Sequence, residues 1–527
     1  MKQSADLKRL LTSIDHKSYP AYKDVRGAYD FNTYILSIDH VQSDPFASPS
    51  KVSIQVRHAK AGFPAELFDT PWKKTALEDY LLRCFSREIG RLSFKAKGSG
   101  KSGLIATSRP GQEVLSRTAC EIGRNEITAR FEVGFPAFGR TINSGELIRI
   151  FFDFLPGCVE NVFFYRRQNN AEIKKRITLA DDQQFIRNEL KRLDLVSFVA
   201  DGSILPRETG VSDRPMKGSV AFHSPDSLRI TLNLPGHGPI SGMAIHRGIT
   251  LIVGGGYHGK STLLKALESG VYNHIPGDGR EYVITDETAV KLRAEDGRSI
   301  NHVDISLFIR DLPNKKDTTC FSTADASGST SQAAAVIESI EAGTRAFLID
   351  EDTSATNFML RDDLMQRIVS RDKEPITPFI ERARDLYKQA GISTVLVAGS
   401  SGAYFFIADT IIQMDAYRPF DITEMVKNAC EQEASKPAIQ APGFKLPTAG
   451  RKLAAGGTGR AVGAMALDFG DSRAEAGGES QEEGENSGRS GRFGNRGGSA
   501  SDAGRFERGR GGRRETDRNS DRNTRIK

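Results

Sequence analysis

Cysteine is scarce in this chain of 527 residues, and its five cysteines follow no pattern. No two of them form a C-x-x-C pair or another spacing typical of metal ligands, and an odd, scattered set argues against a disulfide framework. We therefore expect reduced thiols and an intracellular, cytoplasmic protein. The sequence alone does not separate the cytoplasm from the nucleus or a mitochondrion.

Long hydrophobic runs are absent as well. The most apolar segment, residues 148–165, is interrupted by Asp153, Pro156 and Glu160, which excludes a membrane span. The N-terminal residues MKQSADLKRLL lack the apolar core of a signal peptide. These absences predict a soluble protein with no membrane partner.

A strong excess of one charge is missing from most of the chain. The net charge is +6, but residues 485–527 alone hold eleven Arg and one Lys against six Asp and Glu. The other 484 residues are therefore close to neutral. An electrostatic argument for a nucleic-acid partner has to start from this C-terminal segment.

The length favours two or three domains, because a single hydrophobic core rarely extends beyond about 250–300 residues. Residues 1–215 read as an N-terminal α/β domain and residues 216–435 as a second α/β domain. The boundary is predicted from LPRETGVSDRP, residues 205–215, which carries two prolines and few apolar residues. In the first domain, the patterns predict strands over 31–38, 52–56 and 127–133 and helices over 75–91 and 180–193.

One segment of the first domain, KGSGKSGLI at 97–105, looks like a phosphate-binding loop at first sight. The position five before Gly100 is Lys95 rather than glycine, and no helical run follows. Two readings stay open: a solvated basic turn, or a contact to phosphate or nucleic acid. Residues 134–140 read as a structured loop without an assigned role.

The composition changes from about residue 436. Residues 436–527 are rich in Pro, Gly, Ser and Arg, and they lack the apolar area needed to order themselves, so we predict a linker and a disordered tail. RGG triplets at 496–498 and 510–512, with Phe493 and Phe506 nearby, resemble RNA-binding segments in which arginine contacts phosphate and stacks. RNA association through this tail, a solubilising role and a protein contact all remain open.

Residues 251–264, LIVGGGYHGKSTLL, carry the strongest chemical signal of the chain. An apolar strand leads into a glycine-rich turn that opens a helix, and the turn fits the pattern G-x-x-x-x-G-K-[ST]. Here backbone N–H groups curl around phosphate oxygens, the lysine reaches the β- and γ-phosphates, and the serine hydroxyl holds Mg²⁺. Because no NKxD-like guanine reader is present, we predict ATP and Mg²⁺ as cofactors. The predicted nucleotide-binding residues are Gly254, Gly255, Gly256, Tyr257, His258, Gly259, Lys260, Ser261 and Thr262; Tyr257 and His258 either touch the nucleotide or pack the loop.

A second segment, AFLIDED at 346–352, predicts the metal side of the same site. Residues 346–349 form an apolar strand, and Asp350 follows at its C-terminal end, where a carboxylate binds the Mg²⁺ held by Ser261. Glu351 is placed to polarise the attacking water as a general base. We predict Ser261 and Asp350 as metal ligands, and Glu351 and Lys260 as catalytic residues.

Twenty-three residues before Asp350 lies Ser327, just ahead of the alanine-rich helical run 333–340. ABC ATPases carry their signature L-S-G-G-Q at this distance, and residues 326–330, ASGST, resemble it in the serine and the first glycine. Residues 353–357, TSATN, similarly resemble the ABC D-loop T-S-A-L-D. With the phosphate loop, these motifs make residues 216–435 resemble an ABC-type P-loop ATPase domain.

The resemblance implies how the site is completed. In ABC ATPases the signature helix contacts the γ-phosphate bound by the facing subunit, so two nucleotides lie in a head-to-tail dimer. Ser327 is thus expected to act in trans as a catalytic residue. Because the chain has one set of motifs, the implied partner is a second copy.

Two departures from the ABC pattern bear on turnover. The switch histidine after the apolar run 393–398 is replaced by Gly399-Ser400-Ser401. We predict Ser400 as a further catalytic residue, whose hydroxyl contacts the γ-phosphate but cannot carry imidazole chemistry. The stretch 303–313 has no clear Q-loop glutamine. We therefore expect slow hydrolysis.

Together with GVYNHIPGDGRE at 270–281 and EDGRSINHVDIS at 295–306, these motifs resemble the predicted ABC-class ATPase family of bacteria and several eukaryotic lineages. The resemblance covers about residues 15–435 and implies no transmembrane domain. One kinetoplastid member resembles a mitochondrial RNA-editing component, a ring-shaped homodimer with a basic central pore, which suggests RNA as a partner by analogy.

Two functions of different classes follow. The first is an ATPase that slowly converts ATP to ADP and phosphate in a homodimer and is coupled to RNA binding. The second is an ATP-gated RNA-binding clamp or scaffold with little turnover. A small-molecule P-loop kinase fits less well because of the signature, and a transporter subunit fits least because nothing resembles a coupling Q-loop.

Overall fold

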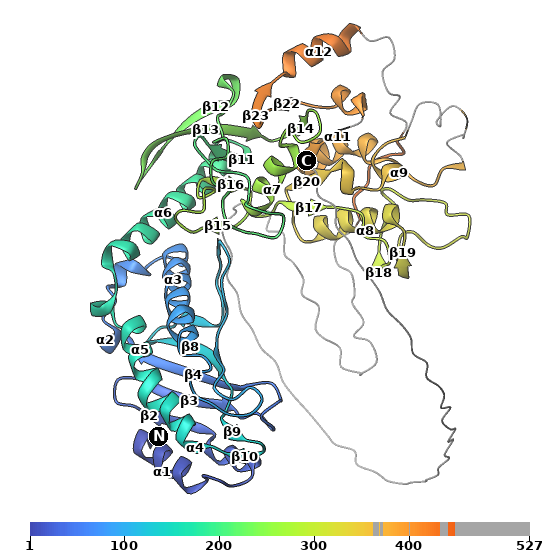
Figure 1. Cartoon of the computed structure of the whole chain (residues 1–527). Coiled ribbons are helices and arrows are strands. Elements are labelled where there is room, and N and C mark those ends of the chain that lie inside the picture. Colours follow the sequence, from blue (N-terminus) through green and yellow to red (C-terminus); the bar gives the residue numbers. More distant parts are fainter. Residues whose placement is uncertain (362–367, 369–372, 400, 433–440, 448–527) are drawn as a thin grey trace, which may run out of the picture. The chain divides into compact units, whose positions relative to one another are not determined.

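The computed structural model describes residues 1–361, 368, 373–399, 401–432 and 441–447. All of these residues belong to one compact unit, Met1–Ala466. The predicted Arg/Gly-rich tail and Ser400 lie outside the described residues. The described part is a mixed α/β protein, as the sequence predicts (Figure 1).

The N-terminal part is built on a sheet in the order β1-β2-β3-β4-β8-β5, with β7 also paired to β8. The two longest strands, β4 and β8, pair antiparallel from Ser50↔Val133 to Arg57↔Glu126. Every second side chain of β8 is buried, the pattern of a sheet with one face against a core. The strands are β1 (Lys2–Gln3), β2 (Gly27–Asp30), β3 (Ile35–His40), β4 (Ser50–Arg57), β5 (Ile105–Ala106), β7 (Cys120–Ile122) and β8 (Glu126–Val133).

The strands predicted over 52–56 and 127–133 are confirmed, but the one predicted over 31–38 is wrong in its first half. Residues 31–34 form the turn between β2 and β3. The backbone N of Asn32 donates to Oδ1 of Asp30 at 2.6 Å, and Asn32 has φ 67, which asparagine tolerates in turns. This side-chain bond offers the backbone an alternative to the sheet.

Helices α1, α3, α4 and α5 share one hydrophobic core with this sheet. Helix α3 starts after Thr70, whose Oγ1 accepts from N of Lys73, and it has Pro71 in its first turn. The helix predicted over 75–91 is thereby confirmed. The helices are α1 (Ser4–Ser13), α2 (His58–Ala61), α3 (Pro71–Gly90), α4 (Ser144–Ile148) and α5 (Leu155–Phe163), and a π-helical turn, Arg149–Phe154, joins the last two.

Helix α6 (Asn170–Arg192) leads to an antiparallel sheet in the order β12-β13-β11-β16. Strands β11 and β12 both pair with β13, and they lie on either side of residue 215, where the sequence predicts a domain boundary. The short strand β15 (Asn273–His274) pairs with β6 (Glu113–Val114), so this part contacts the N-terminal part. The strands of the sheet are β11 (Leu195–Ala200), β12 (Arg229–Leu234), β13 (Gly238–His246) and β16 (Val283–Thr285).

A six-stranded sheet in the order β17-β20-β21-β14-β22-β23 carries the predicted nucleotide motifs. All neighbouring strands are parallel except β22 and β23. Strands β20 and β21 are buried along their whole length, as expected for parallel strands covered on both faces. The strands are β14 (Ile249–Val253), β17 (Val290–Leu292), β20 (Ala346–Asp350), β21 (Ser393–Val397), β22 (Thr410–Asp415) and β23 (Arg418–Asp421).

Helices cover both faces of this sheet. Leu251 and Ile252, neighbours on β14, belong to two different hydrophobic cores, one shared with α11 and the other with α7. The helices here are α7 (Lys260–Ser269), α8 (Gly328–Glu341), α9 (Thr356–Met359), α11 (Phe379–Ala390) and α12 (Thr423–Gln432), and a hairpin of β18 (Arg298–Val303) and β19 (Phe321–Ala326) precedes α8. Among the described residues, no helix has both the length and the apolar character that crossing a membrane requires.

Candidate functional site

The predicted phosphate loop connects β14 to α7. A side chain at Gly254 would clash with the carbonyl oxygen of Met414, and Gly254 has φ 137. Gly259, which precedes α7, has φ 100 and lies against the ring of Tyr417. Only glycine takes these angles without strain. The loop therefore turns tightly into the N-terminus of α7, the arrangement in which backbone amides bind phosphate oxygens.

Lys260 is the first residue of α7, and its side chain folds back over the loop. Its Nζ donates to the carbonyl oxygens of Gly254 at 2.8 Å and Gly255 at 2.9 Å. The ammonium group thus lies beside the first half of the loop. Ser261 follows in the first turn of α7 and is exposed.

The two bulky residues of the loop differ in their surroundings. Nδ1 of His258 lies 2.9 Å from Oδ1 of Asp415 and 3.0 Å from the backbone N of Ala416, in the turn between β22 and β23. Tyr257 has a side chain that is 99% exposed and a positive φ of 64. His258 therefore holds the loop against the β22–β23 turn, while Tyr257 projects from it.

The predicted metal side lies at the end of β20. Asp350 is its last residue and is buried, with Oδ1 accepting from N of Asp352 at 3.2 Å. Its backbone oxygen accepts from the hydroxyl of Ser354 at 2.9 Å. Glu351 begins the following 3-10 turn, Glu351–Thr353. The carboxylates of Asp350 and Glu351 therefore belong to consecutive residues at the C-terminal end of β20.

The end of β21 contributes to the same place. The backbone N of Gly399 donates to Oε2 of Glu351 at 2.6 Å. Nearby, burial raises the pKa of Tyr404 far above its ordinary value, and the negative charge of Glu351 adds to this effect. The predicted contact Ser400 lies outside the described residues, so its position relative to Glu351 stays a prediction.

The register of the sheet brings these ends together. Asp350 pairs with Val397, and Val397 pairs with Ile252, so the C-terminal ends of β20, β21 and β14 lie side by side. In open parallel sheets, ligands bind at this edge, in the crevice where the strand order reverses. The phosphate loop, Asp350, Glu351 and Gly399 are thereby gathered at one edge.

Ser327 precedes α8 as its N-cap residue. Its hydroxyl lies 2.9 Å from that of Thr330, and its carbonyl oxygen accepts from N of Ser331 at 2.8 Å. Between residues 254–262 and Ser327, no hydrogen bond or ion pair is formed in the described part of the chain. The hydrogen bonds of Ser327 in the described part of the chain thus stay within the first turn of α8.

Gln332, which the sequence analysis did not single out, joins α8 to the segment that follows Asp350. It is fully buried in α8, its Nε2 donates to the hydroxyl of Ser354 at 3.0 Å, and its Oε1 accepts from N of Ala355 at 2.9 Å. The signature-like helix is therefore tied to the D-loop-like segment. In the sequence, the only hint of this contact is a glutamine five positions after Ser327.

A buried charged cluster at the C-terminal end of α7 explains much of the motif at 270–281. His274 lies between Asp278, at 2.6 Å, and the carbonyl oxygen of Ser269, at 3.1 Å. Arg207 donates to Asp278 at 2.8 Å. Burial alone would raise the pKa of Asp278, but the bonds from His274 and Arg207 outweigh it and hold that pKa below its ordinary value. The cluster fixes the far end of α7.

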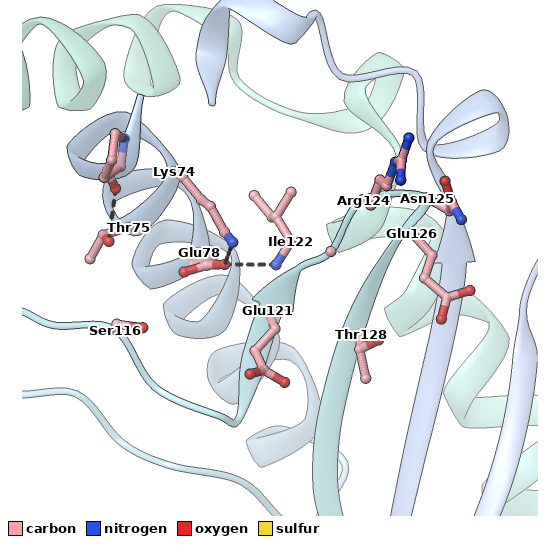
Figure 2. Close-up of a pocket in the computed structure, with 12 residues that line it drawn as sticks. Lys74, Thr75, Glu78, Ser116, Glu121, Ile122, Arg124, Asn125, Glu126 and Thr128 are labelled. Carbon is pink, nitrogen blue, oxygen red and sulfur yellow. Dashed lines mark hydrogen bonds and ion pairs between the residues drawn. The ribbon is translucent and has the colours of Figure 1, made fainter. Parts of the chain in front are cut away.

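A separate cavity of about 630 Å³ lies in the N-terminal part, between α3 and strands β7 and β8 (Figure 2). The backbone N of Ile122 donates to Oε1 of Glu78 at 2.7 Å, and Nζ of Lys74 lies 3.8 Å from the same oxygen. Burial raises the pKa of Glu78. Because Glu78 of α3 accepts a hydrogen bond from Ile122 of β7, its carboxylate stabilises the contact between α3 and β7.

Comparisons with known proteins agree with these motifs. A family model for ABC ATPases, described as a P-loop domain, matches residues 169–446, more than half of the chain. A second model, described as the N-terminal part of ATPases of the ABC class, matches residues 4–166.

One curated relative is an uncharacterized protein of Methanocaldococcus jannaschii, 31% identical over 229 residues, which are 42% of this chain and 50% of the relative. The chain thus spans about half the length of the curated relative it matches.

Solved structures that resemble the chain include a subunit of an ABC transporter complex from Clostridium perfringens (13% identity, TM-score 0.29, 45% of this chain and 92% of that one). Another is an ATP-binding cassette of an ABC transporter in its ADP conformation (13% identity, TM-score 0.25, 37% of this chain and 88% of that one). Both scores are low, so the assignment rests on the family models. The two models together span nearly all of the described residues, and this chain belongs to the family of ATPases of the ABC class.

Proposed function

We propose that the chain binds ATP with Mg²⁺ at the edge formed by β14, β20 and β21 and hydrolyses it slowly to ADP and phosphate. The observation that supports this most is the meeting of the phosphate loop with Asp350, Glu351 and Gly399 at one edge of the sheet. Phosphoryl transfer requires mainly positioning and charge neutralisation, and this edge supplies groups for both.

The residues present fit a magnesium ion. Helix α7, which carries Ser261, contacts β20, which ends in Asp350. A hydroxyl and a carboxylate are hard oxygen donors, and Mg²⁺ takes few protein ligands because water and phosphate oxygens complete its shell. In this proposal Ser261 and Asp350 would hold the ion, which neutralises phosphate charge, and Lys260 binds the β- and γ-phosphates.

Glu351 is the proposed general base. The N–H of Gly399 orients its carboxylate, so the oxygen that accepts a water proton keeps one position. The proposed contact of Ser400 with the γ-phosphate stands in for the switch histidine, and because serine lacks imidazole chemistry, we expect slow turnover.

The site is proposed to be completed by a second copy of the chain. Ser327 and the first turn of α8 form a helix N-terminus suited to an anion. Because residues 326–330 resemble the ABC signature, we assign this turn to the γ-phosphate bound by the facing subunit. The bonds of Gln332 to Ser354 and Ala355 would transmit this contact to the D-loop-like segment.

RNA association is the second part of the proposal, and the Arg/Gly composition of residues 485–527 supports it. If RNA binding is the main task, the chain is an ATP-gated clamp or scaffold in which hydrolysis only resets the closed state. The two versions differ in whether RNA changes the rate of hydrolysis.

The decisive experiment measures phosphate release and solution mass of the full chain with and without ATP, Mg²⁺ and a single-stranded RNA, next to Lys260→Ala. For the parental chain we expect slow, Mg²⁺-dependent hydrolysis and a solution mass that doubles in the presence of ATP. For Lys260→Ala we expect neither hydrolysis nor the doubled mass. Hydrolysis by a chain that stays monomeric would rule out the dimer, and with it the argument that a dimer provides against a P-loop kinase. Deleting 485–527 should remove salt-sensitive RNA binding and leave ATP binding intact if the tail is the main contact.

A further inference from the structure

Three segments that lie far apart in the sequence lock together at one end of the N-terminal sheet. We call residues 42–46, 94–104 and 134–140 the loop cluster. The backbone N of Lys101 donates to the carbonyl oxygen of Pro45 at 2.8 Å, joining the first two segments. The backbone N of Gly103 donates to the carbonyl oxygen of Gly134 at 2.9 Å, and the backbone N of Gly134 donates to that of Leu104 at 2.8 Å, which joins the second and third segments. Ser102 is buried at this junction. The glycine-rich stretch is therefore a packed element and not a loose turn.

The glycines make this packing possible. Gly98, Gly100 and Gly103 all have positive φ, and a side chain at any of them would run into neighbouring backbone or side-chain atoms. Such conformations are available to glycine at no steric cost. The rigid backbone that results holds its flanking residues in fixed places.

Three phenylalanines project from the loop cluster, one from each segment. Phe46, Phe94 and Phe138 are 63%, 52% and 60% exposed. In the described part of the chain, none of the three rings pairs with another aromatic ring. An isolated exposed apolar side chain needs no explanation, but three on one packed element mark an interaction site.

Phe46 and Phe138 border the glycine-rich stretch. Cδ1 of Phe46 lies about 3.0 Å from where a Cβ on Gly100 would be. Phe138 is flanked by Ala137 and Gly139, whose backbone groups bond to Ser99 at 2.8 and 2.9 Å. Phe46 and Phe138 thus stand next to consecutive residues of one loop.

Phe94 carries a further sign of constraint. Its φ is 62, an angle that bulky residues adopt rarely and at a cost. Its backbone N donates to the carbonyl oxygen of Gly103 at 2.7 Å, which fixes this conformation. A strained residue that nonetheless exposes its ring is a mark of functional sites.

Basic side chains accompany the rings. The three segments contain Lys95, Lys97, Lys101 and Arg140 but a single acidic residue, Asp44. Lys95 and Lys97 are exposed, and Arg140 is 82% exposed although Nε lies 3.1 Å from Asp44. Outside the three segments, Oε2 of Glu146 accepts from the backbone N of Lys97 at 3.1 Å. Even with this carboxylate, basic side chains outnumber acidic ones here, although the chain outside its tail is close to neutral.

We propose that the loop cluster binds single-stranded nucleic acid, with Phe46, Phe94 and Phe138 stacking on bases and Lys95, Lys97 and Arg140 contacting phosphates. Exposed aromatic rings beside basic side chains are what unpaired strands require, because each base offers a π face and each nucleotide a phosphate. In a duplex the base faces are stacked on one another, so the three rings could not stack on them. The proposal rests on the RNA association proposed above and places a contact on the folded body, separate from the tail.

The test uses the full chain and a fluorescent oligouridine of about twenty nucleotides, with the matching oligothymidine and a duplex of equal length. Phe46, Phe94 and Phe138 are changed together to Ala, and in a matched variant together to Tyr. Phe420→Ala, at an exposed phenylalanine of edge strand β23, serves as the control. ATP affinity and thermal unfolding report whether each variant is folded.

The alanine variant is expected to bind the oligouridine at least about tenfold more weakly at fixed salt, since stacking contributes roughly 1–3 kcal/mol per base. The tyrosine variant and Phe420→Ala should stay within about threefold, because they keep all three rings of the loop cluster. The duplex should bind more weakly than either single strand, and comparing uridine with thymidine strands tells RNA from DNA.

Several results would overturn the proposal. If the parental chain binds the oligouridine and the alanine variant binds it equally well, the loop cluster is not the contact, although RNA association stands. Equal losses for duplex and single strands would show that stacking is not involved. If the alanine substitutions change the solution mass, the surface is a contact between copies. If the parental chain binds no nucleic acid, RNA association fails with it, while ATP binding is judged separately.

Discussion

The backbone amide of Gly399 donates a hydrogen bond to Oε2 of Glu351 at 2.6 Å. The two residues are 48 positions apart in the sequence. Glu351 directly follows the last residue of β20, and Gly399 comes two positions after the last residue of β21. The candidate base is thus held from the neighbouring strand by a backbone group and needs no histidine for its orientation. This relationship makes the role of Gly399 testable apart from that of Glu351.

Gly399→Pro should lower the rate of hydrolysis about 10- to 100-fold, because proline removes the N–H and a hydrogen bond to a charged group contributes about 1.5–3 kcal/mol. ATP affinity should change little, since Gly399 is not part of the phosphate loop. The control is Gly399→Ala, which keeps the N–H and whose Cβ would lie 4.0 Å from Oε2 of Glu351. Equal rates for both variants would show that the amide has no such role.

Glu351→Gln should reduce hydrolysis at least about 100-fold while ATP still binds, because the amide cannot take a proton from water. An ATP-bound dimer should then accumulate, seen as a doubled solution mass that persists after free ATP is removed. Asp352→Asn, which changes the adjacent exposed carboxylate, provides the control. Hydrolysis by Glu351→Gln at the parental rate would exclude Glu351 as the base.

The parts of this site that the sequence predicted are those that local chemistry determines. The phosphate loop at 254–261 needs glycines where the backbone turns and a lysine at the start of a helix, and these requirements fall within eight consecutive residues. The strand ending at Asp350 and the helix after Ser327 follow from short apolar runs and a cap. The ABC-type α/β fold class is accordingly confirmed.

The relationships that the sequence did not reveal join residues far apart in the chain. The bond from Gly399 to Glu351 depends on β20 and β21 being neighbours in the sheet, and Arg207 meets Asp278 across 71 positions. Phe46, Phe94 and Phe138 look unrelated in sequence and are gathered only by the packing of their backbones. Such pairings are settled by tertiary packing, which no local pattern encodes.

Gly254→Ala should lower the free energy of unfolding of the nucleotide-free chain by about 1–3 kcal/mol, because a side chain there clashes with the oxygen of Met414 and strains φ 137. Urea unfolding followed by circular dichroism measures this change. Gly256→Ala is the matched control for stability, since a Cβ at Gly256 meets nothing within 4 Å, and it should stay within about 0.5 kcal/mol. If both variants lost the same free energy of unfolding, the contact of Gly254 with Met414 of β22 would not constrain the loop.

Asp278→Asn should lower the free energy of unfolding at pH 7 by about 3–5 kcal/mol, because it leaves the buried His274 and the largely buried Arg207 without their carboxylate. The folded-state pKa of Asp278 lies below its ordinary value of 3.8, so this contribution is complete above that value and is lost as the pH falls through the folded-state pKa. The difference between parent and variant should therefore shrink in acid, in urea titrations from pH 7 to pH 3. Asp226→Asn, at a 90% exposed side chain paired with Arg229, should cost at most about 1 kcal/mol. If the difference at Asp278 were the same throughout this range, its charge would not be what holds the end of α7.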